Sequence, residues 1–78
     1  MDLSKGSYVR CKDTGKRGVV ADIPGGSSFM YVRWLNYWDS ETKTAHHYLE
    51  YVYGLNVEPF ALTESDPGLE EIRRKVLR

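Results

Sequence analysis

The order of hydrophobic and polar residues near the amino end predicts a short β-strand over residues 7–13. Hydrophobic and polar positions alternate there, and a period of two is typical of a strand with one buried face. One face carries Val9 and Cys11, and the other carries Tyr8, Arg10 and Lys12. Residues 14–18 place two cations between two glycines, which predicts a tight turn because glycine tolerates positive φ angles.

Four further segments are rich in the β-branched and aromatic residues that strands favour. They are residues 18–23, 29–35, 45–52 and 56–58. In the first of these, Val20 and Ile23 both have the character of core residues although their spacing breaks the alternation. We therefore predict a bulge or bend there, of the kind that a small barrel needs in order to close.

The two middle strands should each have one core face and one outward face. In residues 29–35, Met30, Val32 and Trp34 share the core face. We place Trp34 inward together with Val9, Val32 and Leu49. This assignment leaves Tyr8, Tyr31 and Tyr48 at outward positions. The intervening residues 36–44 are predicted to form a polar hairpin loop that carries Tyr37 and Trp38.

The carboxyl end has the pattern of a short amphipathic helix. Asp66 is suited to cap it, and Pro67 suits its first turn. Leu69, Ile72 and Val76 form one apolar stripe at offsets of three and four. A helix of about eleven residues is too short to be stable alone, so it must dock on the sheet of its own chain or on a partner.

The predicted fold is mainly β, a five-stranded barrel of residues 1–60 with a linker and one C-terminal α-helix in residues 61–78. The sequence of residues 5–58 resembles the small barrels that are similar to Src-homology-3 domains, including KOW-type and Tudor-type modules. The resemblance is carried by Gly6 before the first strand and by the spacing of Gly15, Gly18, Val20 and Ile23. A set of small archaeal proteins that open with Gly-Ser-Tyr-Val-Arg is also similar. Such a resemblance implies a binding role, with RNA or protein for KOW modules and methylated side chains for Tudor modules.

Composition narrows the classes of function. The 78 residues suffice for one small domain, and 11 Lys and Arg balance 11 Asp and Glu. Cys11 is the single cysteine, so no internal disulfide can form, and the start has no apolar leader. Apolar runs are too short to span a membrane. We expect a cytoplasmic protein that makes no contact with a membrane.

No cluster of residues in the sequence indicates catalysis, a metal or a cofactor. The adjacent His46 and His47 should point to opposite faces of a strand, so they cannot chelate one ion there. Cys11 is expected at an inward position, where a thiol behaves as a small hydrophobe. Gly25 and Gly26 lack the helix start of a phosphate loop. We therefore predict a protein that is not an enzyme.

Ten aromatic residues are more than one small core can hold, so several should lie on the surface. Exposed aromatics beside arginine are typical of protein-binding patches. The candidate patch consists of Tyr8, Tyr31, Arg33, Tyr37, Trp38 and Tyr48. The alternative is that the helix covers this face, in which case some of the tyrosines form a second small core.

A second candidate surface is the basic first hairpin. Residues 1–18 hold five Lys and Arg against two Asp, a local charge of 5 − 2 = +3. With Arg33, these cations would suit RNA or DNA, and the aromatics could stack bases. The candidate residues are Arg10, Lys12, Lys16, Arg17 and Arg33. Because the whole chain is neutral, a protein partner is favoured over a polyanion. We also expect the protein to be a monomer or a weak homodimer.

Overall fold

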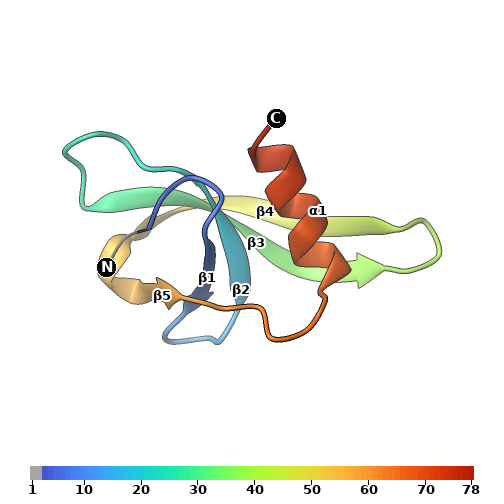
Figure 1. The fold of residues 1–78 in the computed structure, drawn as a ribbon. Coiled ribbons are helices and arrows are strands. Elements are labelled where there is room, and N and C mark those ends of the chain that lie inside the picture. Colours follow the sequence, from blue (N-terminus) through green and yellow to red (C-terminus); the bar gives the residue numbers. More distant parts are fainter. Residues whose placement is uncertain (1–2) are drawn as a thin grey trace.

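Five strands in the spatial order β4-β3-β2-β1-β5 form one antiparallel sheet, and one helix lies against it (Figure 1). The computed structural model describes residues 3–78. The elements are β1 (Tyr8–Cys11), β2 (Arg17–Asp22), β3 (Phe29–Asp39), β4 (Thr44–Tyr53), the 3-10 turn η1 (Gly54–Asn56), β5 (Val57–Pro59) and α1 (Pro67–Val76). The predicted order of strands followed by a C-terminal helix is confirmed.

The sheet is not closed into a barrel. β4 and β5 are its two edge strands, and β5 pairs only with β1. β5 is three residues long and ends at Pro59, which has no N–H to continue a ladder. The prediction of a closed barrel is therefore not confirmed, and an open side remains between the two edges.

The β3–β4 hairpin is longer than the sequence predicted, and it projects beyond the rest of the sheet (Figure 1). Tyr37 and Trp38 lie within β3, so their assignment to a loop was wrong. The strand continues because the pairing register shifts between Leu35 and Tyr37, which accommodates Asn36 as an extra residue in β3. The connection is thus only residues 40–43, where the Asp39 carboxylate accepts the backbone N–H groups of the loop.

Each face of the sheet carries its own core. The first core consists of Val9, Val20, Met30, Val32, Trp34 and Val57. The second core lies beneath the helix and consists of Val19, Ala45, Leu69, Ile72 and Val76. The bulge predicted in the second strand is confirmed, because the β2–β3 register shifts between Val20 and Asp22. Ordinary alternation sends Val19 and Val20 to opposite cores, and the shift after Val20 lets Ile23 pack against the same core as Val20.

The helix begins at Pro67 and docks on the chain's own sheet. The Asp66 carboxylate accepts the Leu69 N–H at 3.1 Å, which is the predicted cap. Leu69 and Ile72 are fully buried, and burial of each such side chain is worth about 1.5–3 kcal/mol. Docking therefore supplies the stability that a helix of 10 residues lacks by itself.

Two polar contacts hold the helix in place at its sides. Glu71 Oε2 accepts the backbone N–H of Ala45 at 2.6 Å, and this bond lowers the pKa of the Glu71 carboxyl. Arg73 Nε donates to the Gly6 carbonyl at 3.0 Å. These contacts connect the helix to β4 and to the segment that precedes β1.

Candidate binding groove at the open edge of the sheet

A row of four aromatic side chains, three of them exposed and Tyr31 half-buried, crosses β3 and β4. We define the aromatic row as Phe29, Tyr31, Tyr51 and Tyr53. Phe29 pairs with Tyr53 across the strands and Tyr31 pairs with Tyr51, so all four side chains are on one face. Their ring centroids are 4.7–5.3 Å apart along the row, and Tyr51 is 50% exposed. The row lies outside the group of side chains that pack beneath the helix.

A groove lies beside this row, on the open side of the sheet between its two edges. Its volume is about 360 Å³, which is at the lower end of the range for ligand sites. The groove is lined by Cys11, Asp13, Phe29, Trp34, Glu50, Tyr51, Val52, Tyr53, Asn56 and Val57. Three residues of the aromatic row are therefore also among the lining residues, although the Trp34 and Glu50 side chains lie on the other face of these two strands.

The groove combines aromatic walls with two carboxylates. Trp34 Nε1 donates to Glu50 Oε1 at 3.0 Å, which holds this carboxylate at the rim of the first core. Asp13 also lines the groove, and neither acid forms an ion pair within residues 3–78. Cys11 is half-buried at the same place, and a side-chain hydrogen bond with Thr14 lowers the pKa of its thiol.

The structure does not bring the predicted aromatic patch together. Tyr31 belongs to the aromatic row, but Tyr48 pairs with Trp34 and therefore lies on the opposite face. Tyr8 and Trp38 are partly buried against the core beneath the helix. Tyr37 is exposed and stacks on His46 with ring centroids 4.2 Å apart. The expectation that these rings share one surface was therefore wrong, because they lie on both faces of the sheet and two of them pack beside the helix.

Arg33 lies on the same face as the aromatic row. It pairs with Leu49 on β4, next to the pair that joins Tyr31 and Tyr51. Leu49 is 49% exposed. Of the predicted partner-binding residues, Arg33 and Tyr31 are thus the two that the fold places on the same face of β3, and both are half-buried.

Most cations of the first hairpin are already paired. Arg10 contacts Glu58 at 2.8 Å and Arg17 contacts Asp66 at 2.9 Å. Lys16 Nζ donates to the Tyr48 hydroxyl at 2.6 Å, and this bond raises the pKa of Lys16, with a smaller contribution from Glu50. Lys12 forms no ion pair in the part of the chain that the structure describes. The candidate nucleic-acid residues are thus spread over separate local contacts.

The two histidines occupy different surroundings. His46 stacks on Tyr37, whereas His47 pairs with Leu35 on the face that carries the helix. Burial is the main cause that lowers the pKa of His47, followed by the charges of Arg33 and Lys75. Its Nδ1 atom is buried without a hydrogen-bond partner among the described residues. Within residues 3–78 no group of three His, Cys, Asp or Glu side chains is placed to hold a metal ion.

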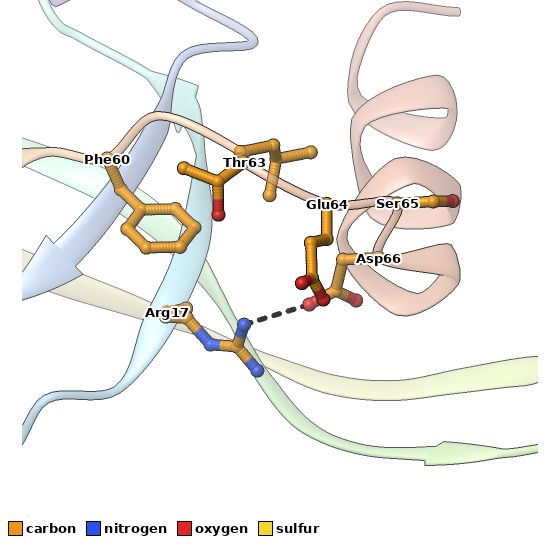
Figure 2. Close-up of a pocket in the computed structure, with 7 residues that line it drawn as sticks. Arg17, Phe60, Thr63, Glu64, Ser65 and Asp66 are labelled. Carbon is orange, nitrogen blue, oxygen red and sulfur yellow. Dashed lines mark hydrogen bonds and ion pairs between the residues drawn. The ribbon is translucent and has the colours of Figure 1, made fainter.

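A second hollow, of about 180 Å³, lies between the linker and β2. Figure 2 shows Arg17 reaching from β2 toward Asp66 at the start of the helix, with Phe60 and Thr63 beside it. The Arg17 guanidinium also lies 5.8 Å from the centroid of the Phe60 ring. Among the described residues, the only cation in the lining of this hollow, Arg17, is paired with the helix cap Asp66. The hollow therefore offers no unpaired cation to a ligand, and the ion pair connects the start of the helix to the sheet.

The residues of the site that the sequence-based candidate sets did not include are Phe29, Glu50, Tyr51 and Tyr53. Sequence reasoning placed Leu49 on the same face as Trp34, whereas the register pairs Trp34 with Tyr48. The available signal was Asn36, a residue type that strands disfavour, in the middle of an aromatic strand. An inserted residue at that position shifts the pairing by one and exchanges the two faces of β4.

Comparisons with protein-family models, with curated proteins and with solved structures find no match. No helix among the described residues has the length and apolar character to cross a membrane.

Proposed function

We propose that this protein is a binding module that is not an enzyme and that takes a protein partner at the aromatic row and the groove beside it. The observation that carries the proposal is the exposure of Phe29, Tyr51 and Tyr53 at the border of a preformed hollow. Aromatic anchors bury a large area at low cost in conformational entropy, which is why they dominate protein interfaces. Arg33 and Leu49 extend the same surface.

The local charges favour protein over nucleic acid as the partner. The groove is lined by Asp13 and Glu50, which would repel a phosphate backbone. Two arginines of the first hairpin are neutralised by Glu58 and Asp66. RNA or DNA binding through that hairpin remains the alternative, with Lys12 as its available cation.

Selection of peptides from a random displayed library tests the proposal on the full chain. We expect the enriched peptides to bind the wild-type protein and to lose at least about tenfold in affinity, about 1.4 kcal/mol, for Tyr51→Ala. Tyr37→Ala is the matched control, because Tyr37 is similarly exposed but lies far along β3 from the row. Binding should be unchanged in that variant.

Two results would contradict the proposal. One is an equal loss for both variants. The other is a failure of selection together with amide shifts at residues 8–18 when a mixed-sequence RNA is added at low salt. Shifts that fade as salt is added would identify the basic hairpin as the functional surface.

A further inference from the structure

The outer edge of β4 presents unpaired backbone groups. In an antiparallel ladder, alternate residues direct their N–H and C=O groups to the same neighbour. The Gly54 N–H bonds to Ser28 at 2.8 Å, on the side of β3, whereas the Ala45 N–H bonds to Glu71 on the helix. The odd-numbered residues of β4 therefore direct their backbone N–H and C=O groups away from β3. This leaves the backbone groups of residues 47, 49, 51 and 53 without a strand partner.

The two edges of the sheet differ in how they are protected. β5 is three residues long and ends at Pro59, so it offers little to a further strand. β4 has 10 residues, and between Thr44 and Tyr53 it contains no Pro, Lys or Arg, the residues that commonly block an edge. Glu71 blocks only the first outward N–H, at Ala45. Of the two edges that border the groove, β4 is thus the one left open.

We infer that an extended protein segment adds to β4 as a sixth strand between His47 and Tyr53, and places a Lys or Arg beside Glu50. This inference rests on the proposed function and specifies that the partner binds as an extended strand with a positively charged side chain. The groove lining includes Asp13 and Glu50, and among the described residues it includes no Lys, Arg or His. A cation placed there gains charge-assisted contacts with two carboxylates.

The alternation of side chains along β4 defines the pattern of the partner. Glu50 shares its face with Trp34, while Leu49 and Tyr51 are on the face of the aromatic row. Residues that lie directly opposite each other in paired strands point to the same side. The bound segment should therefore carry a basic residue opposite Glu50, flanked by apolar residues that cover Leu49 and Tyr51.

A second copy of the chain fits this edge less well. β4 has no Lys or Arg to place beside Glu50, and His46 is already stacked on Tyr37. The occupant we infer is therefore a segment of a different protein. Self-association is an outcome that the test detects.

The test uses two synthetic peptides that differ at one position. The first is acetyl-Thr-Val-Thr-Val-Lys-Val-Thr-Val-amide, and the second has Glu in place of Lys. Amide spectra of the full chain are recorded with up to about a millimolar of each. We expect the Lys peptide to shift and to protect from exchange the amides of His47, Leu49, Tyr51 and Tyr53, and to bind about fivefold tighter than the Glu peptide.

Two controls separate strand addition and charge recognition from nonspecific contact. Glu50→Gln keeps an oxygen for the Trp34 N–H but removes one of the two negative charges, so the preference for the Lys peptide over the Glu peptide should then shrink. Two further Lys peptides are N-methylated on alternate residues, one at the odd positions and one at the even positions. Only the peptide whose methylated residues face β4 loses the N–H groups that donate to it, so only that peptide should lose binding.

Three results would overturn the inference: equal binding of the Lys and Glu peptides to the wild type, shifts without protection along β4, or protection that grows with protein concentration alone while light scattering shows a doubled mass. If library peptides still require Tyr51 in any of these cases, the proposed function stands and only strand addition fails.

Discussion

At the scale of single residues, Gly18 lies where β2 packs against β3 with no room for a side chain. A Cβ atom added to Gly18 would lie 2.5 Å from the Arg33 carbonyl oxygen and 2.9 Å from Trp34 Cε3. Neither the backbone nor the buried indole can withdraw by that amount without disturbing the first core. The absence of a side chain at this position is therefore what lets Trp34 fill the core.

Gly18→Ala should destabilise the protein by about 1–3 kcal/mol, the cost of overpacking a core. Gly25→Ala is the control, because a Cβ atom there meets nothing within 4 Å. Urea denaturation of both variants measures the difference in the free energy of unfolding. Equal midpoints for the two variants would show that β2 and β3 are not packed this closely.

His47 is the residue whose titration should affect stability. Its folded pKa is below the ordinary value of 6.5, mainly through burial and then through the positive charges of Arg33 and Lys75, with Glu71 and His46 as the other ionisable neighbours. The unfolded chain therefore binds the proton more readily than the folded chain. The stability from this group is complete above pH 6.5 and is lost as the pH falls through 6.5 toward the folded pKa.

We expect the free energy of unfolding of the wild type to decrease from pH 7.5 to about pH 5.5, a range above the ordinary titration of carboxyl groups. His47→Gln should flatten this dependence, while His46→Gln should keep most of it. Denaturant titrations at each pH provide the measurement. An unchanged slope in His47→Gln would assign the dependence to another group.

At the scale of elements, the β3–β4 hairpin shows what the sequence could predict and what it could not. The strands themselves, and the face shared by Met30, Val32 and Trp34, followed from alternation. The extra residue at Asn36 did not, because only the pairing of the two strands reveals it. A shift of one residue exchanges the faces of a strand, and so the two faces of β4 were exchanged in the prediction, with Leu49 placed beside Trp34, whereas the outward position of Tyr31 on β3 was correct.

The helix was predictable because its signals are local. Its cap, its apolar stripe and its first-turn proline lie within eleven residues and need no knowledge of the sheet. The face that it would cover was not predictable, because that depends on which strand positions remain free after pairing. This is why Tyr8 and Trp38, expected at the surface, pack beside the helix instead.

Asp66→Ala should cost about 1 kcal/mol, the typical loss for a helix cap. Asp66 also pairs with Arg17, but the Arg17 side chain is 44% exposed, so that pair should contribute less than about 1 kcal/mol. The variant Arg17→Ala separates the two contributions in thermal and urea unfolding. A larger loss for Arg17→Ala than for Asp66→Ala would mean that the ion pair, and not the cap, holds the helix start.

At the scale of the whole molecule, the open side of the sheet is the feature on which the proposed function depends. The curled sheet uses one face for a core around Trp34 and the other for the helix, and neither covers the edge of β4. A short strand with a proline protects the opposite edge. The groove between the edges exists only because the sheet stops short of closure.

Hydrogen exchange of single backbone amides in the free protein tests this openness most directly. The amides of Tyr48, Glu50 and Val52 should be protected by their bonds to β3. Those of His47, Leu49, Tyr51 and Tyr53 should exchange at rates close to those of an unstructured chain, and the Ala45 amide, bound by Glu71, should be slower than these four. Uniform protection along β4 would mean that its edge is paired and would contradict the account.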